Sequence, residues 1–156
     1  MWSSNVKTGA ELAISSIPAS QLAKEFGTPV FIMDEADFRV RTAAWNTALG
    51  NAFGSNAGNV YYAAKAFICV EVARWIKDIG IGIDVCTGGE LAVALKGGID
   101  PAKIEVHGNN KSIAEIEKAV CAGVGTIVID SLFEIERVAA AATKHSVVQK
   151  VLLRLT

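Results

Sequence analysis

Short apolar runs alternate with segments of helical periodicity along most of the chain, and five of these runs finish on an ionisable residue. The five ends follow one another at intervals of 19 to 24 residues. That interval leaves room for a crossover helix between one parallel strand and the next. The pattern therefore predicts four strand–helix units followed by a fifth strand. The five strands would end at Lys65, Asp84, His107, Asp130 and Arg154.

The charged strand ends are the first candidates for chemistry. In a β/α barrel the active site gathers at the carboxyl ends of the strands, so charge there indicates function rather than stability. On the predicted strand VYYAAK, Tyr61, Ala63 and Lys65 share one face. Desolvation at that edge would favour a neutral lysine amine, the nucleophile of Schiff-base chemistry. A lysine whose stem packs under a loop while its amine stays in water is an equally good interpretation.

Two neighbouring strand ends could assist that lysine. Asp84 ends the next strand, and because adjacent strands lie about 5 Å apart its carboxylate could pair with Lys65 or move protons. A plain acid beside a helix start is the alternative. His107 could act as a ligand or as an acid or base, but a histidine held by hydrogen bonds in a loop is the favoured interpretation.

The last two strand ends carry opposite charges. Asp130 is most simply an acid at a helix start, where the helix dipole favours it. Arg154 lies in the apolar run VLLRL, and an arginine there must meet an anion or several carbonyl groups.

The N-terminal part of the chain has a different pattern. We expect an irregular segment over 1–18, a helix over 19–26 that ends at Gly27, and a strand over 29–34. A helix should follow from residue 35 and close at Gly50, before a turn-rich stretch.

Three crossover helices begin with a hydroxyl residue and a glutamate three positions later. This is the capping box, in which the two side chains satisfy backbone N–H groups at the helix start. It favours a structural role for each glutamate over a catalytic one. The pairs are Thr87 with Glu90, Ser112 with Glu115, and Ser131 with Glu134.

A fifth strand with nothing after it would leave open edges and an uncovered apolar face. Four and a half units are about half of an eight-unit barrel, which usually needs about 250 residues. We therefore expect an α/β chain that forms the N-terminal half of a (β/α)8 TIM barrel and is truncated after the fifth strand.

Composition and charge exclude several classes. The formal net charge is −1, so a basic surface for nucleic acid is not expected. No apolar stretch approaches the roughly 18 residues of a membrane span, and the first residues lack the pattern of a signal peptide, which favours the cytoplasm. Neither HExxH nor CxxC occurs, so no metal is expected.

The spacing of Cys69, Cys86 and Cys121 fits neither disulfides nor a metal site. We expect buried thiols, with Cys86 as the exception beside a strand end.

Four sequence stretches, taken together, are specific. They resemble the fold-type III pyridoxal-phosphate enzymes, the alanine racemase and basic amino-acid decarboxylase group, and within that group the diaminopimelate decarboxylase family. In that family Thr87 would take the place of the usual serine, and Phe67 departs from the asparagine common in the broader group. The stretches are YYAAKAF, IGIDVCTGGELAVAL, VHGNNKSIAEIEKAV and TIVIDSLFEIERV.

The resemblance implies a cofactor and roles for particular residues. The cofactor would be pyridoxal 5'-phosphate, held covalently by the amine of Lys65 as the catalytic lysine. Asp84 would be the acid beside it, with both catalytic and cofactor-binding roles, and His107 and Arg154 would contact the cofactor. The phosphate loop and the substrate-binding residues of the family would lie beyond residue 156.

The resemblance also implies a wider architecture and an activity. Residues 1–35 would join a C-terminal β domain, and 36–156 would be part of an alanine racemase-like barrel. The parent would be a homodimer with sites at the interface, and it would convert meso-2,6-diaminopimelate, a small-molecule substrate, to L-lysine and CO2.

Two other functions stay open. One is decarboxylation of ornithine, arginine or carboxynorspermidine by a related enzyme. The other is a homologue that binds the cofactor without catalysis. The fragment made alone would be inactive on either enzyme interpretation.

Overall fold

The computed structural model describes residues 6–7, 9–54 and 58–155, and these residues form two compact units. The first unit spans residues 1–57 and the second 58–156. The division at 35/36 expected from the sequence stays a prediction about the domains of the protein. Among the described residues, no helix combines the length and the apolar character needed to cross a bilayer.

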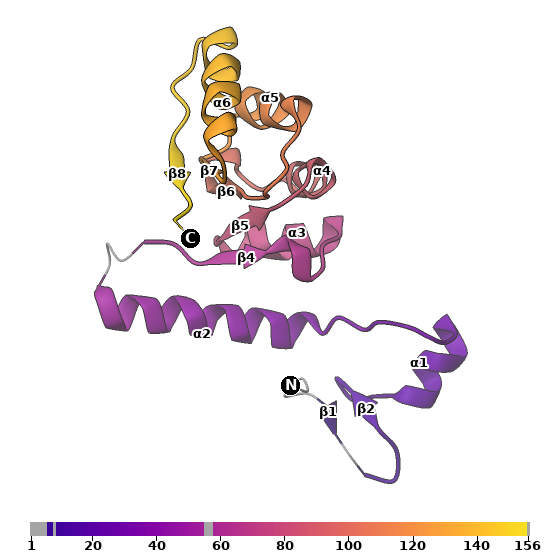
Figure 1. Ribbon diagram of the computed structural model, residues 1–156. Helices are drawn as coiled ribbons and strands as arrows, with labels where there is room; N and C mark the ends of the chain where they lie inside the picture. Colours follow the sequence, from indigo (N-terminus) through magenta and orange to yellow (C-terminus); the bar gives the residue numbers. More distant parts are fainter. Residues whose placement is uncertain (1–5, 8, 55–57, 156) are drawn as a thin grey trace. The chain divides into compact units, whose positions relative to one another are not determined.

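The first unit contains a small antiparallel sheet and two helices (Figure 1). The sheet corrects the expectation of an irregular segment over 1–18, of which residues 1–5 and 8 lie outside the described residues. The elements are β1 (Val6–Lys7), β2 (Ala13–Ile14), β3 (Ile17–Pro18), α1 (Ala19–Phe26) and α2 (Glu35–Phe53).

Helix α1 ends before Gly27, as predicted, and the two expectations that follow it are wrong. Residues 29–34 form no strand among the described residues, and the side chain of Phe31 is 99% exposed. A strand needs a neighbour to bond with, and the pattern of a single segment cannot supply one. Helix α2 runs through Gly50 and ends at Phe53, with Gly54 as its cap, because a glycine inside a helix costs only about 1 kcal/mol.

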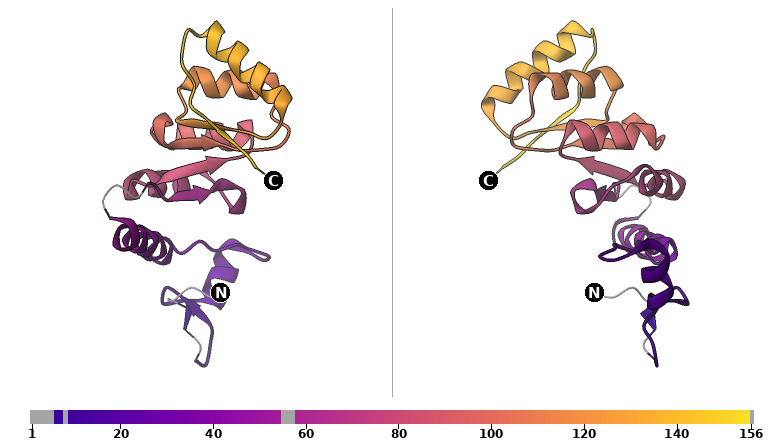
Figure 2. Two further views of the ribbon diagram at one scale, coloured as in Figure 1. Left: turned by 60° about the vertical axis from the view of Figure 1, so that its left-hand side comes forward. Right: turned by 90° about the vertical axis from the view of Figure 1, so that its right-hand side faces the viewer.

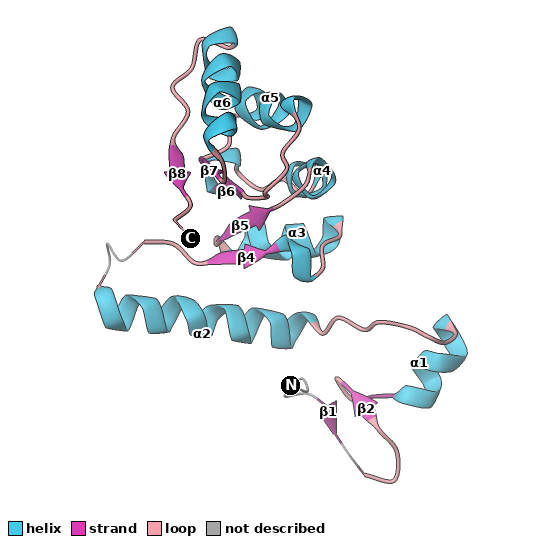
Figure 3. Cartoon of the chain, in the orientation of Figure 1, coloured by secondary structure: helices cyan, strands magenta, loops and turns pink. Residues whose placement is uncertain are grey.

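The second unit is a five-stranded parallel sheet with its strands in chain order, β4-β5-β6-β7-β8. A crossover helix joins each strand to the next, as predicted (Figure 3). The strands are β4 (Tyr61–Ala63), β5 (Gly82–Val85), β6 (Ile104–Val106), β7 (Thr126–Ile129) and β8 (Val151–Leu153). The helices are α3 (Val70–Ile79), α4 (Gly88–Lys96), α5 (Ile113–Ala122) and α6 (Leu132–Lys144).

The four crossover helices lie along one face of this sheet, each beside the next (Figure 2). Between the helices and the strands lies the core, in which Ile83, Val85 and Ile127 are fully buried. These side chains alternate along their strands with residues that face the opposite side. The fold is the sequential, singly wound half of a β/α barrel, in which function is expected at the carboxyl ends of the strands.

The helix starts agree with prediction to within one residue, but the caps differ from one another. Only Ser112 and Glu115 form the complete box. Thr87 accepts a hydrogen bond from the backbone of Glu90, whose carboxylate turns instead to the N–H of Cys86. The hydroxyl of Ser131 makes no capping hydrogen bond within the described part of the chain.

Candidate functional site

Lys65 lies just beyond the strand that was predicted to contain it. Strand β4 ends at Ala63, and Lys65 is the middle residue of a 3₁₀ turn, Ala64–Ala66. Its side chain is exposed, so the predicted desolvation is wrong. The backbone leaves the extended conformation one residue before Lys65, so the period-two rule does not assign the face of its side chain. The amine is nevertheless accessible at the carboxyl end of the first barrel strand.

The loop after Lys65 is fixed by a tyrosine that sequence reasoning did not single out. The hydroxyl of Tyr62 donates a 2.7 Å hydrogen bond to the backbone oxygen of Phe67. Burial raises the pKa of this phenol, so the hydroxyl stays protonated and able to donate. Lys65 therefore lies in a short turn that is tied at both ends to β4.

Asp84 faces the site from the neighbouring strand β5, where it pairs in register with Ala63. Its side chain is 18% exposed. One carboxylate oxygen, Oδ1, lies 3.8 Å from Nε2 of His107 and 3.9 Å from the Cys86 sulfur. The side chain therefore contacts two other residues of the same edge.

The electrostatics of Asp84 connect it to Lys65. Burial raises the pKa of the Asp84 carboxyl, and the positive charges of His107 and Lys65 oppose that rise. The charge of Lys65 therefore lies close enough to Asp84 to act on its carboxyl group. This proximity agrees with the predicted neighbourhood of the two residues.

His107 is the first residue after β6, and its backbone N–H donates a hydrogen bond to the oxygen of Val85. Its Nε2 atom lies 3.6 Å from Oε1 of Glu105 as well as 3.8 Å from Asp84. Sequence reasoning missed Glu105. The signal was present in the alternation along β6, because Glu105 and His107 are two residues apart and share a face. The imidazole thus lies within 4 Å of two carboxylates.

Asp130 and Arg154 form an ion pair at the far end of the edge. Nη1 of Arg154 lies 3.0 Å from Oδ1 of Asp130, and the backbone N–H of Arg154 bonds to the oxygen of Ile129. Arg154 therefore meets an anion, as the apolar surroundings in the sequence required. Asp130 orients the guanidinium rather than serving only as an acid at a helix start.

The three cysteines correct another expectation. Cys69 and Cys121 are exposed rather than buried, and only Cys86 is partly covered. Burial raises the pKa of the Cys86 thiol, and the charges of Asp84 and Glu90 add to the rise. Cys86 therefore stays a neutral thiol that donates to Asp84.

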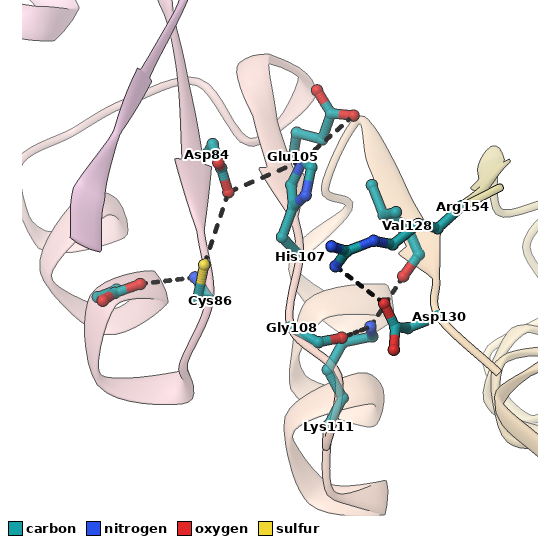
Figure 4. A network of polar contacts seen from close by, with 10 residues as sticks. Asp84, Cys86, Glu105, His107, Gly108, Lys111, Val128, Asp130 and Arg154 are labelled. Carbon is teal, nitrogen blue, oxygen red and sulfur yellow. Dashed lines mark hydrogen bonds and ion pairs between the residues drawn. The ribbon is translucent and has the colours of Figure 1, made fainter. Parts of the chain in front are cut away.

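The structure thus brings Asp84 together with His107, and Asp130 together with Arg154, along one edge. In Figure 4, His107 lies between Asp84 and Arg154, in the order of their strands. An accessible primary amine, a partly buried carboxyl group, an imidazole and a guanidinium make up this set. The set fits an aldehyde cofactor that carries an anionic group, because the amine can bind the aldehyde and the guanidinium the anion.

The chain also matches a family model. Residues 35–156 match the family described as "Pyridoxal-dependent decarboxylase, pyridoxal binding domain". The match includes every residue of the edge described above.

Two mycobacterial proteins that are similar in sequence to this chain are both diaminopimelate decarboxylases. Diaminopimelate decarboxylase of Mycobacterium tuberculosis is 57% identical over 93% of this chain and 31% of its own length. The protein of that name from Mycobacterium leprae is 50% identical over 100% of this chain and 32% of its own length.

A solved structure has the same fold. A crystal structure of diaminopimelate decarboxylase from M. jannaschii superposes with a TM-score of 0.87 at 25% identity, over 98% of this chain and 36% of that one. The chain therefore spans about a third of the length of the relatives that it matches. From the family match over residues 35–156, with this geometry, the chain belongs to the pyridoxal-dependent decarboxylases and carries residues of their pyridoxal-binding domain.

Proposed function

We propose that this chain supplies the lysine-bearing edge of a pyridoxal phosphate site in an enzyme that converts meso-2,6-diaminopimelate to L-lysine and CO2. The observation that carries the proposal is the similarity to diaminopimelate decarboxylases, which extends over nearly the whole chain. The accessible amine of Lys65 beside Asp84 supports it independently, because Schiff-base chemistry needs a lysine amine as its nucleophile.

Pyridoxal phosphate, when bound, supplies an electron sink for the bond to the departing carboxylate. The residues of this chain have the simpler tasks of binding and orientation. Lys65 presents the amine that holds the cofactor covalently, and the turn fixed by Tyr62 sets where that amine lies.

Asp84 and His107 supply a carboxylate and an imidazole next to the Lys65 amine. Whenever the Lys65 amine is free and protonated, the Asp84 carboxylate stabilises the ammonium. His107 can hold a proton at Nε2, between Asp84 and Glu105. At the other end of the edge, Asp130 holds the Arg154 guanidinium in place for an anionic group.

Two wider properties belong to the same proposal. The whole protein forms a homodimer with its sites at the interface, and it works in the cytoplasm. A net charge of −1 is consistent with a small-molecule substrate rather than nucleic acid.

The test is a substrate panel on the whole protein that carries this chain. With pyridoxal phosphate present, we expect CO2 release and L-lysine from meso-diaminopimelate, and little release from ornithine or arginine. A Lys65→Ala variant is the matched control and should release none. Preferred CO2 release from ornithine or arginine would show that the proposed substrate is wrong. Binding of the cofactor without CO2 release from any of the three amino acids would support a non-catalytic homologue.

A further inference from the structure

A buried ion pair lies directly behind the candidate site. Lys111 belongs to the segment between β6 and α5, and Glu134 to the first turn of α6. Their side chains are 2% and 3% exposed, and Nζ of Lys111 lies 3.1 Å from Oε2 of Glu134. Burying two charges is costly unless other hydrogen bonds satisfy them. The further contacts of each partner therefore indicate what the pair does.

Lys111 uses its ammonium to join two strand ends. Nζ donates to the backbone oxygen of Gly108 at 2.5 Å and to that of Val128 at 2.8 Å (Figure 4). Together with Glu134 these acceptors use all three N–H groups of the ammonium. Gly108 follows His107 directly, and Val128 lies in β7, two residues before Asp130. One cation thus ties the loop after β6 to the end of β7.

Glu134 extends the same network to the backbone of Asp130. Its Oε2 atom accepts a 2.8 Å hydrogen bond from the N–H of Asp130, whose carboxylate holds Arg154. Its second oxygen, Oε1, is buried and has no hydrogen-bond partner among the described residues. A helix cap alone does not require a buried lysine, so the cost of this arrangement points to a further role.

The backbone conformation of the loop that carries His107 is restricted at Gly108 as well. Gly108 has a φ of +110°, which a residue with a side chain rarely adopts, and a Cβ there would lie 3.0 Å from the oxygen of Cys86. Lys111 binds the carbonyl of this same glycine. The position of the His107 backbone is therefore set by Gly108 and Lys111 together.

We propose that Lys111 and Glu134 are positioning residues that hold His107, Asp130 and Arg154 in register for the cofactor. That the ligand is pyridoxal phosphate rests on the proposed function. The positioning role rests on the hydrogen bonds and the ion pair described above. Neither residue reaches the reacting atoms.

The test compares two double variants in the whole protein, because removing one charge alone leaves the other buried and unpaired. Lys111→Met with Glu134→Leu removes the whole network. Lys111→Met with Glu134→Gln also removes both charges but keeps an oxygen that accepts from the Asp130 N–H. Lys118→Met, at an exposed lysine of α5, is the control.

The readouts are urea denaturation, amide exchange at Asp130 and the dissociation constant for pyridoxal phosphate. In the Met/Leu variant we expect near-parental stability, faster exchange at Asp130 and cofactor binding weakened by about tenfold, the lower end of the loss seen at metal sites when a partner that orients a ligand is removed. In the Met/Gln variant the Asp130 amide should regain protection, while binding stays weakened because Gly108 and Val128 remain untied. Lys118→Met should match the parent throughout.

The proposal is overturned if either folded double variant binds the cofactor within about twofold of the parent, well below the roughly tenfold loss expected when orienting partners are removed. Unchanged exchange at Asp130 in the Met/Leu variant would overturn the role of Glu134. Should the parent itself bind no pyridoxal phosphate, the proposed function fails, and the exchange result alone decides the positioning role.

Discussion

At the scale of single residues, Asp84 has a charge state that matters for both folding and chemistry. Burial raises the pKa of its carboxyl above the ordinary value of 3.8. Between 3.8 and the higher folded pKa, the folded state binds more protons than the unfolded state, so stability falls as the pH rises through that window. Above the window the folded protein carries the full cost of the ionised, partly buried group.

Asp84→Asn should therefore stabilise the protein at neutral pH and remove this part of the pH dependence. Urea denaturation of parent and variant at several pH values between 4 and 7 measures the difference. Glu136→Gln, at an exposed glutamate of α6, is the control and should change little. A variant that is less stable than the parent at pH 7 would show that the contacts with His107 and Cys86 outweigh burial.

The candidate site could be predicted from the sequence in its location but not in its pairings. Spacing of the apolar runs placed three of the five residues directly after their strands and Asp84 within the end of β5, whereas Lys65 lies two residues beyond β4. The three are His107, Asp130 and Arg154. It could not show that Arg154 pairs with Asp130, because that contact depends on the side-chain conformations of two neighbouring strands. Lys111 was missed because nothing in the pattern of a loop residue marks it as buried.

At the scale of elements, α5 has the most complete helix start. Oγ of Ser112 accepts from the N–H of Glu115 at 3.2 Å, and the Glu115 carboxylate bonds back to Ser112. The same carboxylate also accepts from the N–H of Gly88, at the start of α4. These backbone hydrogen bonds hold the pKa of Glu115 below its ordinary value. One glutamate thus links two adjacent helix starts.

Ser112→Ala should destabilise the protein by about 1 kcal/mol, the usual cost of losing an N-cap hydroxyl. Ser131→Ala is a matched control at the same position of α6, where the hydroxyl caps nothing within the described residues. Its effect should be close to zero. Urea denaturation measures both, and equal losses in the two variants would contradict the assignment of the caps.

Helices and parallel strands were largely predictable because their signals are local. Apolar periodicity and cap residues lie within each element, and the α4, α5 and α6 starts follow from them. The segment 29–34 shows the limit. Its apolar pattern is that of a strand, but strand formation depends on a partner, and the described residues provide none.

At the scale of the whole molecule, the outermost strand of the second unit presents apolar surface. The side chains of Val151, Leu152 and Leu153 are 40%, 48% and 64% exposed. A groove of about 250 Å³ between α6 and β8 is lined almost entirely by apolar residues, among them Ile129 and Val138. Exposed strand edges and apolar faces of this kind pair with other chains.

The polypeptide of these 156 residues, made alone, should therefore self-associate and show no decarboxylase activity. Sizing chromatography with light scattering measures the association over a range of concentrations. Leu153→Lys on the exposed strand should reduce association, whereas Lys118→Met on α5 should not. A stable monomer at high concentration would contradict this account of the β8 surface.

The central claim is that Lys65 holds pyridoxal phosphate, and borohydride reduction followed by peptide mapping tests it most directly. Reduction converts the bond between the amine and the cofactor into a stable secondary amine that survives digestion. In the whole protein we predict the label on Lys65, and its loss in both Lys65→Ala and Lys65→Arg, since a guanidinium keeps the charge but cannot serve as the nucleophile. Label on another lysine, such as Lys103 or Lys111, or undiminished label in the Lys65→Ala variant, would contradict the claim.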